Sequence, residues 1–521
     1  LKVRGYSLVG VPGVLIGHNQ KIAWGMTNLS ADVDDIYVEV LDGKSQKTAW
    51  EGLDSSLNDV YTALDEEDLT IQVRNGRGSL DPVPFKLRSI RKHGPVFSDH
   101  IPEVHKALEH IGKSQNLSLV ATYRWVGHEK SSEFAAILGV NRASNFSEFK
   151  AALSDFRAGA QNLVFADVAG DIGYYGNGNF PNRPYASVAQ APFVPVVPYL
   201  RGVTSKVFFP YRKPAEWEGF RNEVPLLHNP ASGRIVTANN DPFGQSSQSG
   251  TEGFEDYFGF SFSTGVRAQR ISDLLDQQKG KLTLQSMQAI QTDHVDLLVA
   301  RFLDLVRKNQ KGLNLSARAH ALKDRLLDWN CEMLANRHEP LLADALLGEL
   351  FTVYLEKYLP SVPAVLWQEI DRTALVAKSV YHRLADGLKS DFEKTRASNL
   401  EILSSALERA AEKIEVKNLH NVRWGKYHRV TFFNPLLGIV PSLGSFPYER
   451  DGSWETVDVA GESYGPNFRL IMSLKAGHSI EAVTSVAGGN YSPTDRTGFS
   501  SELLRWREKG EAAYRPLVPF L

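Results

Sequence analysis

Three aspartates crowd one short loop near the beginning of the chain. Asp32, Asp34 and Asp35 come directly before the apolar run Ile36–Val38. Hard divalent cations prefer several oxygen ligands, which carboxylates and backbone carbonyls supply. The loop is not an EF-hand, because it lacks a glycine at the sixth position and a glutamate at the twelfth. The residues alone leave two interpretations open, a cation site or a solvated acidic loop.

A second candidate for chemistry is the Gly-Glu-Ser-Tyr-Gly string centred on Ser463. This spacing fits the nucleophile elbow of α/β-hydrolases, in which a strand precedes the serine and a helix follows it. Here Pro466 and a strand-like apolar run follow the string. The acid and the histidine of a triad should come after the serine in that order, but His478 precedes Asp495. The sequence therefore disfavours Ser463 as a nucleophile.

A third polar group is formed by Asn239, which begins an Asn-Asn-Asp-Pro string, and Arg267. Taken alone, Asn-Asn-Asp-Pro is typical of a turn, and an arginine at the start of a helix is typical of a surface ion pair. His18, in a Gly-His-Asn string, is predicted to be a packing and turn residue.

The composition excludes several classes of protein. The chain has 521 residues, 42% of them apolar, and a net charge of −2, so it can bury a large core. No basic cluster indicates a nucleic-acid partner, and no apolar run approaches the length that spans a membrane. There is neither a His-Glu-x-x-His motif nor a paired-cysteine motif for zinc. The single cysteine, Cys331, fits a reducing or an oxidising compartment.

The first half of the chain is predicted to be rich in strands. Short apolar or alternating runs bounded by turn residues predict strands at Val14–Ile16, Ile36–Val38, Thr70–Val73 and Leu163–Phe165. Hairpin turns are expected at Asn75-Gly76 and Ala169–Asp171. The proline-rich residues 184–232 are expected to make a long ordered excursion over a sheet face.

The character of the chain changes near Gly265. Apolar residues then recur at steps of three and four, which predicts helices, as in Val295, Leu298, Phe302 and Leu305, and in Leu346, Leu347, Leu350, Phe351 and Tyr354. After residue 425, strands are expected at Val430–Phe432, Trp454–Val457 and Arg469–Met472. We therefore divide the chain into a core, residues 1–264, a helical lobe, 265–425, and returning strands that complete the core, 426–521.

Five segments, taken in order, resemble the penicillin acylase family of N-terminal-nucleophile hydrolases. They are GYSLVGVPGVLIGHNQKIAWGMTNLSADVDDIYVEV (5–40), QNLVFADVAGDIGYYGNGNFPNR (161–183), NPASGRIVTANNDP (229–242), GFEDYFGFSFSTGVRAQRISDLL (253–275) and the closing pair GPNFRLIMSL (465–474) and GGNYSP (488–493). Each is weak alone, but together they span nearly the whole chain. Two departures are visible, because the family usually has serine at Asn467 and Gln-Ser-Gly at residues 489–491.

The resemblance implies an α+β fold. This is the αββα core of the N-terminal-nucleophile hydrolases, two stacked sheets flanked by helices, here with a helical lobe. It also implies that the chain is most of a β-subunit, with an α-subunit from the same precursor. The family's nucleophile is a serine freed by self-cleavage, a few dozen residues upstream of the first segment. Since the sequence begins at Leu1, we expect it to lack that serine and to be inactive alone. A periplasmic or secreted location is implied as well.

The resemblance also assigns roles by position. Asn239 corresponds to a side-chain donor to the oxyanion and Asn28 to a backbone N–H donor, while Arg267 corresponds to an arginine that orients Asn239. The family binds one structural calcium ion, and its ligands match the carboxylates of Asp32, Asp35 and Asp256 and the carbonyls of Asp34 and Pro181.

The acyl pocket is the least legible part. Leu15, Ile16 and Met26 fall at positions that line the family's pocket and would suit a medium acyl chain or an aromatic ring. Simple core packing is the alternative. The predicted function is hydrolysis of a linear amide of a small N-acyl compound, either a β-lactam side chain or an acyl-homoserine lactone. A non-catalytic member of the family that only binds acyl-amides is the alternative from another class.

Overall fold

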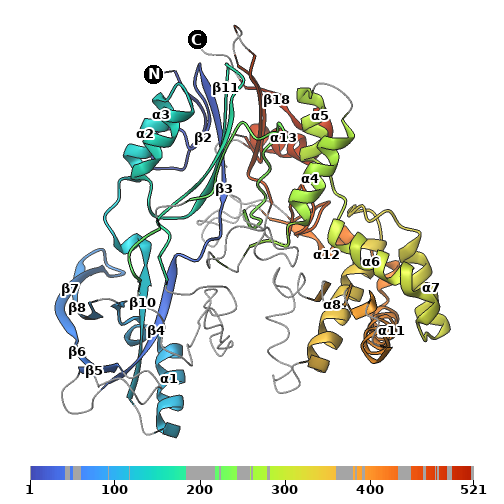
Figure 1. The fold of residues 1–521 in the computed structure, drawn as a ribbon, viewed down its shortest axis with the longest axis horizontal. Helices are drawn as coiled ribbons and strands as arrows, with labels where there is room; N and C mark the ends of the chain where they lie inside the picture. The colour runs from blue at the N-terminus through green and yellow to red at the C-terminus, as the bar shows by residue number, and fades with distance from the viewer. Residues whose placement is uncertain are drawn as a thin grey trace.

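The computed structural model describes most of the chain, and every structural statement below concerns that part (Figure 1). The described residues are 2–41, 47–50, 60–91, 93–115, 118–183, 217–221, 224–242, 259, 262–278, 282–358, 380–381, 384–385, 387–389, 393–431, 447–461, 465–475, 477, 480–489 and 496–517. Asp256 and most of the proline-rich excursion lie outside them. No described helix is both long and apolar enough to cross a membrane.

A six-stranded sheet forms the centre of the core. Its strands lie in the order β1 (Arg4–Tyr6), β2 (Ile16–His18), β3 (Ile22–Asn28), β11 (Gln161–Asp167), β12 (Ile172–Asn177) and β13 (Leu226–His228). All neighbours are antiparallel. The hairpin between β11 and β12 turns at residues 168–171, where the Asp167 carboxylate accepts the backbone N–H groups of Ala169, Gly170 and Asp171. This turn confirms the prediction from Ala169–Asp171.

Alternation along the strands explains how the sheet is covered. Side chains of a strand alternate between its two faces, and Trp24 of β3 lies opposite Phe165 of β11 in the register. Both pack in a buried cluster with Phe146 and Phe149 of α3 (Phe146–Ala152), beside α2 (Glu133–Arg142). One face of the sheet is therefore covered by this helix pair.

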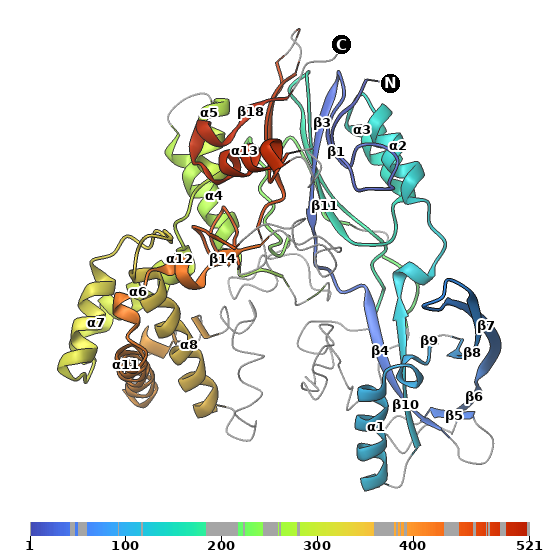
Figure 2. The ribbon, with the colours of Figure 1, turned by 180° about the vertical axis from the view of Figure 1, so that it is seen from behind.

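A second sheet faces the first. It contains β16 (Phe468–Ser473), β17 (Glu481–Val486) and β18 (Arg515–Pro516). Tyr6 of β1 stacks on Phe468 with 3.8 Å between ring centroids, and its hydroxyl is hydrogen-bonded to Thr484. In both views the sheets lie side by side, with α2 and α3 outside the first and α4 (Val266–Gln277), α5 (Leu284–Gln291) and α13 (Arg496–Arg507) beside the second (Figures 1 and 2). This is the expected αββα arrangement.

A separate β-rich region extends from the core at β4. One sheet of this region packs on α1 (Pro102–Gln115) and has the strand order β10 (Ser118–Trp125), β4 (Asp34–Leu41), β5 (Lys47–Trp50) and β6 (Val60–Ala63). A second sheet next to it consists of β7 (Asp65–Arg74), β8 (Leu80–Ile90) and β9 (Gly94–Pro95). The expected Asn75-Gly76 turn is longer than a two-residue hairpin. Asn75 N–H donates to Ser79 O, and the left-handed residue is Gly78, with φ of 84°.

The helical lobe is built from α6 (Leu297–Asn309), α7 (Ala317–Leu327), α8 (Glu339–Tyr358) and α11 (Glu393–Val416) around one large apolar cluster. The predicted stripes are buried in it, including Leu298, Phe302 and Leu350. Val295 instead precedes α6, because Asp296 caps that helix by accepting the N–H of Val299.

The short elements after the lobe are only partly as predicted. A small sheet joins β14 (Arg429–Val430) to β15 (Tyr448–Glu449), after the single-turn α12 (Trp424–Tyr427). The strand expected at Arg469–Met472 is β16. The prediction of a strand at Trp454–Val457 is wrong. This segment forms turns between Gly452 and Ala460, which the Thr456 hydroxyl closes.

Candidate active site

Asn239 lies between β13 and α4 in the sequence, and its backbone is strained. Its backbone has φ of 60°, in the left-handed region that asparagine tolerates better than most residues. The loop is held by Ser263, whose N–H donates to Asn239 O at 2.8 Å and whose hydroxyl donates to Ala238 O at 2.8 Å. Strained backbone of this kind clusters at functional sites, so the conformation marks Asn239 as a candidate for function.

The Asn239 side chain bridges two distant parts of the chain. Its Nδ2 donates to the backbone oxygen of Asn28 at 2.9 Å, across 211 positions of sequence. Its Oδ1 accepts from Nη2 of Arg267 at 3.0 Å. Since Arg267 can only donate, this contact fixes which end of the amide is oxygen. The three residues predicted to act together are therefore in direct contact.

The register of β3 determines where the Asn28 backbone points. Positions along an antiparallel pair alternate between hydrogen-bonded and free of ladder bonds. Leu29 N–H donates to Ala160 O, and Asn28 is paired with Gln161 at the next position. The N–H and C=O of Asn28 hence make no ladder bond with the β11 backbone, and the carbonyl accepts two side-chain amides, from Asn239 and, at 3.0 Å, from Asn162 of β11. The Asn28 N–H lies on the same side of β3 as its carbonyl.

Asn240 has a different environment from its neighbour. Its Oδ1 accepts the backbone N–H of Ala238 at 3.0 Å, and its Nδ2 donates to Asp241 O at 3.3 Å. Both are local bonds between a side chain and the neighbouring backbone. Asn240 therefore shapes the loop, while the Asn239 amide is directed at Asn28.

Arg267 is set in place by the beginning of α4. Gly265 precedes the helix with φ of 84°, a conformation that side chains other than glycine rarely adopt. Thr264, next to it, donates its hydroxyl to Glu455 Oε2 at 2.7 Å. Thr264 and Glu455 were not among the residues predicted from sequence, and an alternating string such as Trp454–Val457 carries no signal for this contact.

The acidic loop converges on an arginine. Arg183 donates from Nε to Asp35 Oδ2 at 2.9 Å, from Nη1 to Asp32 O at 3.0 Å and from Nη2 to Asp34 O at 3.4 Å. Its Nη2 also lies 3.5 Å from Asp32 Oδ1, and its side chain is only 3% exposed. Pro181 stands two residues earlier on the same segment. Three of the predicted calcium ligands, Asp32, Asp34 and Asp35, thus contact one guanidinium group.

Two aromatic residues also donate hydrogen bonds to the acidic loop. Trp217 Nε1 also donates to Asp35 Oδ2, and Tyr123 donates its hydroxyl to Asp34 Oδ2 at 2.7 Å. The pKa of Asp35 is raised to about 6, first by burial and also by the Asp32 carboxylate, while Arg183 and the Trp217 hydrogen bond act in the opposite direction.

The predicted pocket residues lie in or directly before strands β2 and β3. Leu15 N–H donates to Tyr6 O, and Ile16 begins β2. Met26 packs against the apolar cluster beneath α2 and α3. Thr27 points to the opposite face, where its hydroxyl contacts that of Thr237 at 3.2 Å. Met26 thus makes the contacts of a core residue, and the pocket role of all three stays a prediction.

The competing features are less suited to catalysis. Ser463 lies outside the described residues, but the element after Gly465 is the strand β16, where a nucleophile elbow requires a helix. His18 is buried, its Nδ1 lies 2.9 Å from Asn19 O, and burial lowers the pKa of its ring.

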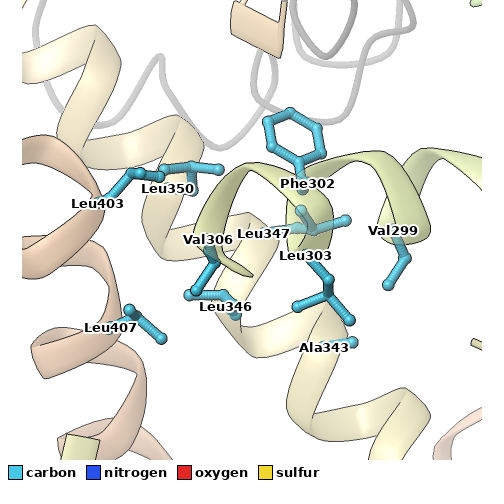
Figure 3. Close-up of a pocket in the computed structure, with 10 residues that line it drawn as sticks. All are labelled: Val299, Phe302, Leu303, Val306, Ala343, Leu346, Leu347, Leu350, Leu403 and Leu407. Atoms are coloured by element: carbon cyan, nitrogen blue, oxygen red, sulfur yellow. The ribbon is translucent and has the colours of Figure 1, made fainter. Parts of the chain in front are cut away.

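An apolar cavity lies inside the helical lobe, where side chains of α6, α8 and α11 point toward one another (Figure 3). Its volume of about 10 Å³ is barely that of one water molecule, and its walls offer no polar partner. It is a packing gap and not a ligand site. Its lining residues are Val299, Phe302, Leu303, Val306, Ala343, Leu346, Leu347, Leu350, Leu403 and Leu407.

The profile of the Penicillin amidase family matches residues 1–516. The chain belongs to the penicillin amidase family. The acyl-homoserine lactone acylase QuiP of Pseudomonas aeruginosa is 25% identical over 505 residues, which cover 89% of this chain and 55% of QuiP. Penicillin G acylase of Escherichia coli is 26% identical over 340 residues, covering 64% of this chain and 35% of that enzyme. This penicillin amidase chain thus spans little more than half of QuiP.

A solved relative confirms the fold. A thermostable penicillin G acylase from Alcaligenes faecalis superposes with a TM-score of 0.68 at 19% identity, over 99% of this chain and 88% of that one. The α+β fold of an N-terminal-nucleophile hydrolase, predicted from the five sequence segments, is therefore the fold of this member of the penicillin amidase family.

Proposed function

We propose that the complete protein hydrolyses a linear amide of a small N-acyl compound, and that this chain supplies the groups which stabilise the oxyanion. The nucleophile in this proposal is an N-terminal serine, freed by self-cleavage of a precursor and carried outside these 521 residues. Its α-amine is the base for its own hydroxyl, because an α-amine titrates at roughly pH 8 and is partly neutral near pH 7.

The observation that carries the proposal is the chain of contacts from Arg267 through Asn239 to Asn28. An oxyanion hole needs donors that are held in place before the reaction. A primary amide nitrogen carries two hydrogens, so Asn239 Nδ2 can donate one to Asn28 O and offer the other to substrate. The N–H of Asn28 lies on the same side of β3 as its carbonyl. Arg267 holds the opposite end of the amide and prevents its rotation.

The class of substrate follows from the relatives and from the chemistry together. Acyl-homoserine lactones and penicillin G both carry a linear amide between an acyl group and a cyclic amine component. Two hydrogen-bond donors at the amide oxygen would stabilise the oxyanion formed from either substrate. We propose the N-acyl group as the recognised part, with the α-subunit derived from the same precursor completing the site.

The decisive experiment replaces Asn239 in the complete, matured protein. Asn239→Ala should lower kcat by roughly 10²–10³ while KM changes little, because the donor acts mainly in the transition state. Amine release is measured on penicillin G and on acyl-homoserine lactones of several chain lengths. Hydrolysis of none of these substrates by the wild type, or equal rates for wild type and Asn239→Ala, would refute the proposal.

Asn240→Ala is the matched control, because it removes the same amide one residue away. Asn240 holds the turn through Ala238 and Asp241, so its loss should cost stability. Turnover per folded molecule should remain far closer to wild type than in Asn239→Ala. A fall in kcat as large as that of Asn239→Ala would mean that the loop shape, and not the Asn239 donor, determines the rate.

We also propose one structural calcium ion at the acidic loop. Its ligands would be the carboxylates of Asp32, Asp35 and Asp256 and the carbonyls of Asp34 and Pro181. Support comes from the carboxylate and carbonyl oxygens of Asp32, Asp34 and Asp35, which lie together around Arg183. The ion would tie β4 to the segment after Pro181 and would take no part in bond cleavage.

A periplasmic or secreted location fits the same proposal. Weak calcium sites fill outside the cytoplasm, where calcium is abundant. The only cysteine, Cys331, is buried, and burial raises the pKa of its thiol to about 11. A buried protonated thiol is inert, so an oxidising compartment would not trap this chain in a wrong disulfide.

A further inference from the structure

The turns at Gly452–Ala460 are anchored on several elements at once. Gly452 N–H donates to Met333 O, and Asp458 N–H donates to Asp293 O. The Ser453 hydroxyl donates to Asp296 Oδ2 at 2.6 Å, and the buried Thr456 closes the turn on itself. Residues 452–460 are thus held both by contacts to the helical lobe and by their own hydrogen bonds. We call this segment the platform.

Glu455 projects from this platform to the beginning of α4. Its Oε2 accepts the hydroxyl hydrogen of Thr264, which is itself only 6% exposed. Arg267 follows three residues after Thr264, in the first turn of the helix. The pKa of the Glu455 carboxyl is raised to about 7, first by burial and also by the charge of Asp296, while the Thr264 hydrogen bond and the charge of Arg267 act in the lowering direction.

We propose that Glu455 is a positioning residue for the amide hydrolysis, acting through Thr264 and Arg267 on the Asn239 amide. This inference rests on the function proposed above. Thr264 links the start of α4, and with it Arg267 in the first turn, to the platform. Arg267 in turn holds Asn239 Oδ1. Glu455 touches neither the substrate nor the reacting atoms in this scheme.

The charge of Glu455 makes the device sensitive to pH. The groups that face it are Thr264 and Arg267 at the start of α4 and Asp296 at the start of α6. Near neutral pH the carboxyl passes between its neutral and charged forms. The charged form attracts Arg267, so the orientation of Asn239 should be best fixed above about pH 7.

Four variants of the complete, matured protein test the inference. Glu455→Ala removes both the acceptor and the charge, and should lower kcat about tenfold with KM nearly unchanged. Glu455→Gln keeps an acceptor for Thr264 but no charge, so the step of kcat near pH 7 should disappear. Thr264→Val should resemble Glu455→Ala, and Thr264→Ser should restore the wild-type kcat. The threonine pair keeps the test decisive if Glu455→Ala fails to mature.

Glu502→Gln serves as the control. Glu502 is also a buried glutamate, but it lies in α13 against Arg505 and Arg515. Its loss should affect stability and leave the kcat–pH profile superimposable on that of wild type. A kcat and pH profile of Glu455→Ala equal to wild type, while Asn239→Ala is impaired, would overturn the inference and leave the proposed function intact.

A structural readout decides the matter without any activity. In a crystal structure of Glu455→Ala, or of Thr264→Val, Arg267 should have moved away from Asn239 Oδ1. An unchanged 3.0 Å contact would overturn the inference even if the proposed function failed and no substrate were found.

Discussion

Replacing Asp458 by asparagine should strongly destabilise the core. The Asp458 side chain is 2% exposed and accepts both Arg450 Nη2 and Arg469 Nη2 at 2.9–3.0 Å. His294 Nε2 lies 2.9 Å from the same carboxylate. Both guanidinium groups also lie over the ring of Trp506, at 4.0 and 5.5 Å. This cluster joins the helical lobe to β16 and α13.

The expected size follows from the burial of the partners. Asparagine keeps the shape of aspartate but no charge, so two buried cations lose their counter-ion. Removing one partner from a buried ion pair costs about 3–5 kcal/mol. The exposed pair Arg234–Asp276 is the contrast, because surface salt bridges contribute about 0–1 kcal/mol. Asp458→Asn should therefore melt several degrees below wild type, while Asp276→Asn should melt within about two degrees of it.

The pH dependence gives a second measure of the same cluster. Burial by itself raises the pKa of Asp458, but Arg450 and Arg469 outweigh it and hold the pKa well below its usual range. The stability from this group is therefore present above about pH 4, where an unfolded aspartate is charged, and is lost as the pH falls below that value. Thermal unfolding is followed by circular dichroism from pH 7 to pH 2. Asp458→Asn should lack this part of the acid destabilisation. A melting temperature of Asp458→Asn equal to that of Asp276→Asn would refute the reasoning.

Three further outcomes are expected. Arg183→Gln should raise the calcium affinity of the complete protein, measured by titration calorimetry, because the guanidinium competes for the same oxygens; an unchanged affinity would place the ion elsewhere. Burial raises the pKa of Glu455 to about 7, so stability should fall as the pH rises from about 4.3 to 7. In thermal melts, Glu455→Gln should flatten this dependence of stability on pH. A dependence identical to that of wild type would contradict the raised pKa of Glu455. The chain of residues 1–521 alone should hydrolyse none of the N-acyl substrates, and turnover that depends on Ser463 would overturn the mechanism.

Much of the fold could be predicted because its signals are local. The apolar spacing of Leu346, Leu350 and Tyr354 produces one buried stripe in any helix of this length, and α8 buries all three. The turn at Ala169–Asp171 needs only its own residues and Asp167. The strand predicted at Trp454–Val457 was wrong for the opposite reason.

There the alternating pattern is real, but distant groups override it. Thr456 closes a turn with its hydroxyl, and Asp458 is drawn to Arg450 and Arg469. The partners of Glu455 and Ser453 lie on α4 and before α6. A β-propensity describes a half-buried pleated surface, and among the described residues no strand pairs with 454–457.

The sequence by itself determined the family, the αββα core and the identity of Asn28, Asn239 and Arg267 as candidates, because residue types at ordered spacings carry that information. Only the tertiary structure decided that these three meet, since 211 positions separate the partners of one hydrogen bond and 28 those of the other. It also decided that Arg183 lies among the aspartates and that Glu455 faces Thr264. Hydrogen bonds and ion pairs act over a few ångströms in space, and a linear sequence does not record which distant groups the packed core brings within that distance.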